Sequence, residues 1–285
     1  MEKEIINPKN AKFYIEKFLK IKTKDNKIKG LKLNPSQKKL YETIKREHNL
    51  GKPVRIIILK ARQMGFSTLS EALIFHSTVT RENVNSQIIA HTGESTSNLF
   101  NMSKLFYDEL PSFMKPMLKA SNAKELIFEN PTKKQKEKRE NPGLRSKIKC
   151  TTANASGVGR SDTLTNLHVS EYAFWEGDKR GTLTGLMQAV PNLKGTMVII
   201  ESTANGFDDF KAMWDSAVRG ESDFVPLFFP WFEMKENRMN ANGIILTSEE
   251  KELKGFFPLM MNKLPGEDGA LKTTVEVISD GSERN

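Results

Sequence analysis

The chain has 285 residues, a formal net charge of +9 and a single cysteine, Cys150. This length is enough for one large α/β domain or two small ones, and no apolar run approaches the length of a bilayer span. One thiol excludes an internal disulfide framework and a cysteine-based zinc site. The positive charge favours nucleic acid or another polyanion as the partner. The charged N-terminus, residues 1–4, lacks an apolar signal core, so we expect a protein that is not secreted.

The first segment with a clear pattern is Ala11 to Ile21, whose apolar spacing predicts a helix on the edge of the domain. Next, the run from Leu33 leads through Gln37 into a second helical pattern that continues to His48. A glutamine placed one helix ahead of a phosphate-binding strand can hold the adenine edge with its amide donor and acceptor. The alternative is that Gln37 only caps the first helical turn.

The stretch from Ile56 to Thr68 predicts a buried strand, a tight glycine-containing turn and the start of a helix. This is the context of a phosphate-binding loop (Walker A motif), in which backbone N–H groups converge on anionic oxygens. Laid on the usual pattern G-x-x-x-x-G-K-[ST], the sequence has Lys60 for the first glycine and Phe66 for the lysine. Lys60 or Arg62 is then the candidate to replace the missing cation. The alternative is an ordinary strand–helix turn with exposed cations.

The next segments alternate between strand and helix. Gln87–His91 predicts a strand and Glu94–Leu110 a helix, which favours an α/β fold with a mainly parallel central sheet flanked by helices. Leu126–Phe128 and Ser146–Cys150 predict the two strands of an inserted β-hairpin. The loop between them, residues 131–143, carries five cations, which either contact a phosphate backbone or are simply solvated.

Two further strands are expected to end in polar groups. Leu164–Ser170 delivers Glu171 to a carboxyl end, the edge of an open α/β sheet where ligands bind. Thr196–Glu201 runs into the small, polar segment Ser202–Gly206. The glycine-rich, basic segment Ala155–Asp162 is expected to face the site or a neighbouring subunit. A helix from residue 210 to 219 and a strand from 224 to 229 complete the pattern, and the chain beyond residue 265 is a polar tail.

The strand ends at Lys60–Ser67, Ser170–Glu171 and Ser202–Asn205 follow one another along the chain as in a P-loop ATPase. An extra strand is expected between the phosphate loop and the acid. Hydrolysis needs a phosphate cradle, a magnesium ion and a group that orients water. Ser67 can ligate magnesium and Glu171 can polarise the water, although a lone carboxylate at a strand end can also be a surface group. Most such enzymes have an aspartate before the catalytic acid to hold the magnesium shell, whereas Ser170 offers only a hydroxyl, so the metal is expected to be held mostly by Ser67, phosphates and waters.

Four runs resemble the large terminase subunit of tailed bacteriophages: Lys60–Thr68, Val169–Trp175, Ser202–Gly206 and Val225–Trp231. The similarity covers roughly residues 30 to 255. It implies a P-loop NTPase fold of the ASCE type, with ATP and Mg²⁺ as cofactors. It also implies an ATPase that drives translocation of viral double-stranded DNA into a prohead.

The resemblance further implies the roles of individual residues. Glu171 is the catalytic carboxylate, and Arg62 is a candidate arginine finger, acting in cis or on a neighbour. From the residues themselves, we expect magnesium to be held by Ser67, with Ser170 as a ligand through water. The segment that couples hydrolysis to motion and senses the γ-phosphate comprises Ser202, Thr203 and Asn205. The nucleotide-binding residues are Gln37, Lys60, Arg62, Gln63, Met64, Gly65, Phe66, Ser67 and Thr68.

For the whole chain we expect an N-terminal helical extension (1–30), an ATPase core (31–232) and a C-terminal lid or linker with a polar tail (233–285). In this family a nuclease domain should follow residue 255, and the residues that remain are too few, so we expect no nuclease activity. The implied partners are double-stranded DNA, the portal protein, the small terminase subunit and further copies of the chain in a ring on the prohead, in the host cell cytoplasm and without a membrane. The alternatives are a helicase-like nucleic-acid-dependent ATPase and a non-catalytic DNA-binding assembly protein, the latter favoured by Phe66 and Ser170.

Overall fold

The structure is a computed structural model that describes residues 10–155, 162–234, 247–249 and 251–252. The chain divides into two compact units, Met1–Asn237 and Arg238–Asn285. In the second unit, the described residues 248, 249, 251 and 252 are helical. In the part of the chain that is described, no helix is long and apolar enough to cross a membrane. All elements discussed below belong to the first unit.

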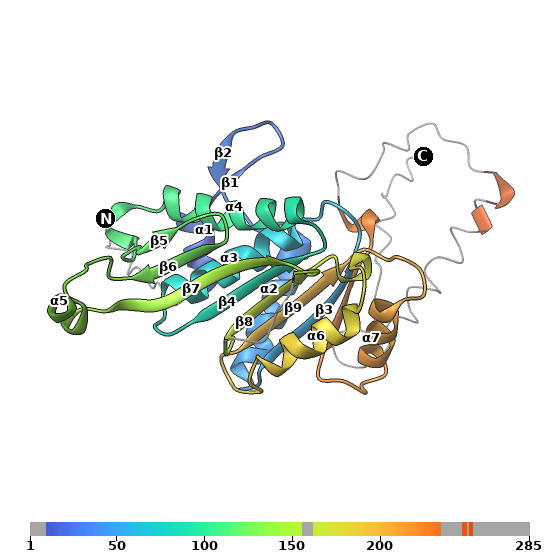
Figure 1. Cartoon of the computed structure of the whole chain (residues 1–285). Coiled ribbons are helices and arrows are strands. Elements are labelled where there is room, and N and C mark those ends of the chain that lie inside the picture. Colours follow the sequence, from blue (N-terminus) through green and yellow to red (C-terminus); the bar gives the residue numbers. More distant parts are fainter. Residues whose placement is uncertain (1–9, 156–161, 235–246, 250, 253–285) are drawn as a thin grey trace, which may run out of the picture. The chain divides into compact units, whose positions relative to one another are not determined.

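An eight-stranded sheet forms the centre of this unit (Figure 1). Its six-strand portion from β10 to β7 is parallel, and β6 and β5 are antiparallel to their neighbours. In spatial order the strands are β10 (Val225–Phe229), β3 (Val54–Lys60), β9 (Met197–Ser202), β8 (Asn166–Ser170), β4 (Asn85–Ala90), β7 (Gly143–Thr152), β6 (Glu125–Glu129) and β5 (Ala120–Ser121). β9 lies between β3 and β8, so the predicted extra strand between phosphate loop and acid is confirmed. This arrangement is that of a P-loop NTPase.

Helices cover both faces of the sheet, because successive residues of its strands point to opposite sides and both sets are apolar. Ile56 and Ile58 of β3 pack into one apolar cluster with α1 (Ala11–Phe18), α2 (Pro35–Asn49), α3 (Phe66–Val79) and α4 (Gly93–Glu109). Ile57, between them, packs into a second cluster with α6 (Lys179–Gln188) and α7 (Asp209–Val218). A parallel sheet covered on both faces requires strands that are apolar throughout, which the run Ile56–Leu59 provides.

The remaining elements are short. They are the hairpin β1 (Lys20–Lys22) and β2 (Ile28–Gly30), the helix α5 (Gln135–Glu140), and the 3₁₀ turns η1 (Ser112–Met114), η2 (Tyr172–Phe174) and η3 (Trp231–Glu233). The predicted first helix is therefore shorter than expected, because the chain becomes extended at Leu19 and pairs as β1. η2 directly follows Glu171 and fixes the chain after the acid.

Two predictions about the middle of the chain need correction. The expected hairpin is present as β6 and β7, but it belongs to the main sheet, because residues Lys147–Thr152 of β7 pair in parallel with β4. The expected loop of residues 131–143 contains the short helix α5. Of the glycine-rich segment Ala155–Asp162, residues 156–161 lie outside the described part, so its expected position next to the site stays a prediction.

Candidate active site

The predicted phosphate loop connects β3 to α3. Lys60 is the last residue of β3, and Gly65 ends the loop with a left-handed backbone (φ 78°) that allows α3 to begin at Phe66. A Cβ at Gly65 would lie 2.8 Å from the amide nitrogen of Gln37. The loop therefore ends at a position that favours glycine for its backbone conformation, and a Cβ there would also require the Gln37 amide to shift.

Gln37 holds the loop from the adjacent helix. Its Nε2 donates to the carbonyl of Gly65 at 2.6 Å, while its Oε1 accepts from the N–H of Asn34 at 2.9 Å. Asn34 accepts in return from the N–H of Gln37, completing a capping box, and donates to the carbonyl of Met64 at 3.1 Å. The capping role is thus confirmed, with both ends of the amide engaged, and the adenine contact of Gln37 stays a prediction.

Substituting Gly65 with alanine is expected to destabilise the loop. A left-handed backbone costs a non-glycine residue about 1–2 kcal/mol, and the new methyl group would also displace Gln37. Gly51→Ala is the matched control, because Gly51 has φ 74° and a methyl group added there would have no atom within 4 Å. Urea unfolding of both variants measures the difference, and equal losses of unfolding free energy would show that the Gln37 contact imposes no constraint.

The other loop side chains point in different directions. Phe66, at the position of the usual lysine, is buried with its ring 4.3 Å from that of Phe229, so only its backbone N–H is available to a phosphate. Met64 is buried as well, whereas Gln63 is exposed and accepts from Lys24 at 3.0 Å. Arg62 is exposed, and its side chain makes no hydrogen bond or ion pair with another described residue.

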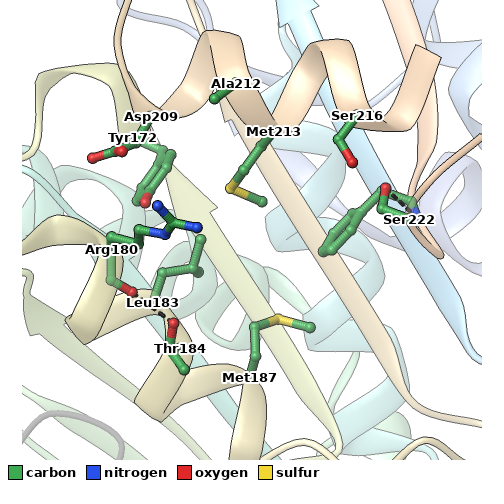
Figure 2. A pocket seen from close by; sticks show the side chains of 11 residues that line it. Tyr172, Arg180, Leu183, Thr184, Met187, Asp209, Ala212, Met213, Ser216 and Ser222 are labelled. Carbon is green, nitrogen blue, oxygen red and sulfur yellow. Dashed lines mark hydrogen bonds between the residues drawn. The ribbon is translucent and has the colours of Figure 1, made fainter. Parts of the chain in front are cut away.

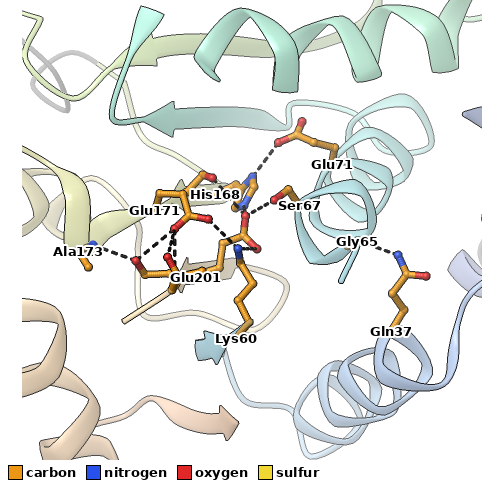
Figure 3. A network of polar contacts seen from close by, with 12 residues as sticks. Gln37, Lys60, Gly65, Ser67, Glu71, His168, Glu171, Ala173 and Glu201 are labelled. Atoms are coloured by element: carbon orange, nitrogen blue, oxygen red, sulfur yellow. Dashed lines mark hydrogen bonds and ion pairs between the residues drawn. The ribbon is translucent and has the colours of Figure 1, made fainter. Parts of the chain in front are cut away.

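Lys60 is buried and meets the predicted catalytic acid. Its Nζ lies 2.7 Å from Oε1 of Glu171, which directly follows β8 (Figure 3). Glu171 itself has a left-handed backbone (φ 51°), an uncommon conformation for a glutamate. Its Oε2 accepts from the N–H of Thr203 at 3.1 Å and from the Thr203 hydroxyl at 3.2 Å. The structure therefore joins the loop cation, the acid and the predicted coupling segment in one network.

The rest of the coupling segment is anchored next to the acid. The Ser202 hydroxyl lies 3.5 Å from Oε2 of Glu171 and accepts from the N–H of Ala173 at 3.1 Å. The Asn205 amide donates to the carbonyl of Ala173 at 3.2 Å. A displacement of Glu171 would therefore change the contacts that hold the segment from Ser202 to Asn205.

Three further charged residues lie at the site and were not predicted from the sequence: Glu201, His168 and Glu71. All three are completely buried. Oε1 of Glu201, on β9, accepts from the hydroxyls of Ser67 and Ser170, the latter at 3.2 Å. His168 lies between the two carboxylates, with Nε2 3.2 Å from Glu201 and Nδ1 2.7 Å from Glu71. The signal in the sequence was a charged residue inside an apolar strand or helix.

Lys60 and Glu201 remain charged although both side chains are buried. Burial alone would lower the pKa of the Lys60 ammonium, but the carboxylates of Glu201 and Glu171 outweigh it and raise that pKa above its ordinary value. Burial would raise the pKa of Glu201, yet Lys60, followed by His168 and Ser67, brings it down to about 2. Both groups are therefore charged at neutral pH.

The imidazole of His168 is held as a cation. Burial would lower its pKa, but the hydrogen bonds to Glu201 and Glu71 raise it to about 9. Burial raises the pKa of Glu71, although His168 and Ser103 act against it. Because an acceptor faces each ring nitrogen, His168 donates from both and fixes the orientation of Glu201.

The chemistry of these groups suits a phosphorylated ligand with a hard metal ion. The N-terminus of α3 and Lys60 supply positive charge for phosphate oxygens. Among the described residues no group of three or more His, Cys, Asp or Glu side chains could hold a metal alone. A metal at Ser67 would therefore need ligand oxygens and waters, which is how Mg²⁺ is usually bound.

A separate pocket of about 390 Å³ lies between α6 and α7 (Figure 2). Its walls are largely apolar, with Leu183, Met187 and Met213 inside and with Arg180 and Asp209 toward one end. Neither Lys60 nor the acidic residues of the network line it. The pocket is therefore distinct from the phosphate loop.

No family model matches the chain. The structure is similar to that of the large terminase of bacteriophage HK97, with a TM-score of 0.60 at 16% identity over 89% of this chain and 53% of that one. It is also similar to the large terminase ATPase domain of Thermus phage P74-26, with a TM-score of 0.50 at 17% identity over 77% of this chain and 97% of that domain. The chain thus spans about half of the HK97 protein. It has the fold of a large terminase ATPase domain, as the resemblance of its motifs predicts.

Proposed function

We propose that this chain is the ATPase of a viral DNA-packaging motor, in which ATP hydrolysis drives translocation of double-stranded DNA into a prohead. The observation that carries the proposal is the network of Lys60, Glu171 and Thr203. It places a carboxylate between the cation of a phosphate loop and the segment that follows β9. The likeness to terminase ATPase domains supports the choice of this motor among P-loop ATPases.

The proposed hydrolysis uses groups that already lie together. Backbone N–H groups of the loop and the Lys60 ammonium bind the phosphates, while Glu171 orients the attacking water. Lys60 neutralises Glu171 at 2.7 Å before nucleotide binds, so a phosphate that attracts the ammonium also releases the carboxylate. Arg62, exposed on the loop, is the second cation and the candidate finger in cis or in trans.

The magnesium ion is proposed to lie at Ser67, where it would neutralise charge on the phosphate oxygens. The Ser67 hydroxyl is at the start of α3 and already contacts a carboxylate, that of Glu201. Ser170 donates to the same carboxylate, which is compatible with its predicted contact with the metal through water.

Coupling to motion is proposed to pass from Glu171 to the segment Ser202–Asn205. When Glu171 turns toward water, it gives up its bonds from the N–H and the hydroxyl of Thr203. The segment can then change position together with Asn205, which is anchored on η2. Such a two-state contact is what a translocation step requires.

The remaining assignments complete the proposal. We assign the ATPase core to residues 31–232, flanked by an N-terminal extension (1–30) and a C-terminal lid or linker (233–285). The proposed partners are double-stranded DNA, a portal protein, a small terminase subunit and other copies of the chain in a ring, within the host cell cytoplasm. The net charge of +9 suits the DNA partner.

The proposal is tested in two steps with the purified chain. Calorimetric titration with ATPγS is expected to give saturable binding that is stronger with Mg²⁺ than with EDTA. ATP hydrolysis and DNA movement are then measured with and without portal-bearing proheads, which are expected to be required for DNA movement. DNA movement without proheads would point to a helicase-like ATPase, and absence of nucleotide binding would leave a DNA-binding assembly protein.

A further inference from the structure

Glu201 has an oxygen that the folded chain leaves without a hydrogen bond. The residue is fully buried, and its Oε2 finds no hydrogen-bond partner among the described residues. This oxygen lies 4.0 Å from Nζ of Lys60, at the outer limit of an ion pair. A buried carboxylate oxygen without a donor is costly, so its retention at the phosphate loop points to a ligand.

The contacts of the other oxygen, Oε1, indicate the kind of ligand. Oε1 of Glu201 accepts from Ser67, the hydroxyl that follows the loop, and from Ser170, the residue where most P-loop ATPases have an aspartate. In that class the loop hydroxyl and the aspartate together hold the magnesium ion. Glu201 therefore contacts both positions that define this metal site.

The sheet explains how a residue of β9 reaches this place. Ser170 and Glu201 are register partners in the parallel pairing of β8 with β9, so their side chains lie on the same face. Glu201 is also paired with Ile58 of β3, on the other side. A carboxylate on the intervening strand starts closer to the phosphate loop than one on β8 would.

A second set of residues holds this carboxylate in place. His168 donates to Glu201 and is itself held by Glu71, which also accepts from the Ser103 hydroxyl at 3.2 Å. Such supporting hydrogen bonds orient groups at metal sites and tune their affinity. The arrangement from Glu71 to Glu201 is built from buried residues of α3, β8 and β9.

We propose that Glu201 replaces the missing aspartate at Ser170 as the carboxylate of the magnesium site, and that His168 and Glu71 position it. The site would take a divalent cation together with the phosphates of a nucleotide, with Ser67 as the second protein group. This inference rests on the proposed ATPase function, which it deepens. It also explains how the site could bind magnesium without an aspartate at position 170.

The test measures metal-dependent nucleotide binding rather than turnover. Affinity for ATPγS is determined by calorimetry in Mg²⁺ and in EDTA for the wild type and for Glu201→Gln, with Glu140→Gln as a control of equal charge change at an exposed position. Glu201→Gln is expected to lose about 10- to 100-fold of the affinity gained with Mg²⁺, while affinity in EDTA changes little. Adding Ser170→Asp to Glu201→Gln is expected to restore the gain.

The outcomes separate this inference from the proposed function. If the wild type binds no nucleotide, the function fails; if it binds and Glu201→Gln keeps the full Mg²⁺ gain, only the role of Glu201 is overturned. If the folded double variant does not recover the gain in affinity with Mg²⁺, the proposal that Glu201 of β9 replaces an aspartate at position 170 of β8 is also overturned. If Glu201→Gln does not fold, as judged by circular dichroism, Glu201→Asp replaces it in the test. This variant keeps the charge, but its shorter side chain moves the carboxylate oxygens away from the site. An unchanged gain in affinity with Mg²⁺ would then overturn the proposal.

Discussion

Replacing Glu171 with glutamine is expected to lower the rate of ATP hydrolysis by about 10²- to 10⁴-fold, the usual contribution of a positioned general base. The amide keeps the shape of the side chain but cannot take up a proton. Nucleotide affinity is expected to remain close to that of the wild type, because the phosphates are bound by the loop and by Lys60. Single-turnover hydrolysis and calorimetric titration of ATPγS measure the two effects separately.

Glu176→Gln is the matched control for this variant. Glu176 lies five positions further along, is exposed, and undergoes the same change of charge. It is expected to leave hydrolysis unchanged. Turnover of Glu171→Gln at the wild-type rate would mean that another group orients the water and would remove Glu171 from the catalytic role.

Lys60→Ala is expected to have the largest effect on stability as well as on binding. The ammonium lies between the carboxylates of Glu171 and Glu201, at 2.7 and 4.0 Å. Removing one partner of a buried ion pair costs about 3–5 kcal/mol, because Glu201 would remain buried with only His168 as a cationic partner. The loop would at the same time lose a positive charge for phosphate. Urea unfolding and ATPγS titration measure the two losses.

Arg62→Ala serves as the comparison because Arg62 belongs to the same loop but is exposed. Its effect on unfolding is expected to stay within about 0.5 kcal/mol. If Arg62→Ala lowers nucleotide affinity and Lys60→Ala does not, Arg62 is the replacement for the usual lysine. Combining Lys60→Ala with Glu201→Gln is expected to recover part of the lost stability, since the buried carboxylate that lost the Lys60 ammonium is removed too.

The parallel sheet was predictable because its strands are continuous apolar runs. Ile56–Leu59 and Met197–Ile200 are short, largely β-branched apolar runs flanked by polar turns, which predicts buried strands. The helix α6 was not predicted, since Gly181 and Gly185 interrupt a pattern in which only Leu183 and Leu186 are buried. Its position depends on packing against the second apolar cluster, which local propensity does not report.

The hairpin of β6 and β7 also shows that local sequence patterns do not report long-range contacts. The antiparallel pairing of β6 with β7 was predicted because the two strands are joined by one connection. The parallel pairing of β7 with β4 joins residues that are some sixty positions apart, such as Ile88 and Cys150. Long-range register depends on how the whole sheet assembles, so the sequence predicted the hairpin but not its pairing with β4.

The chain's local patterns were enough to predict a phosphate loop, a catalytic acid at Glu171 and a coupling segment at Ser202–Asn205, because each follows an apolar strand. They left Glu201 as one more strand residue and His168 without a role. Whether a buried charge is a defect or a site depends on what surrounds it, and here the partners Ser67, Glu71 and Lys60 come from other elements. Folding brings these charges together, and their mutual compensation is what makes the burial of each one affordable.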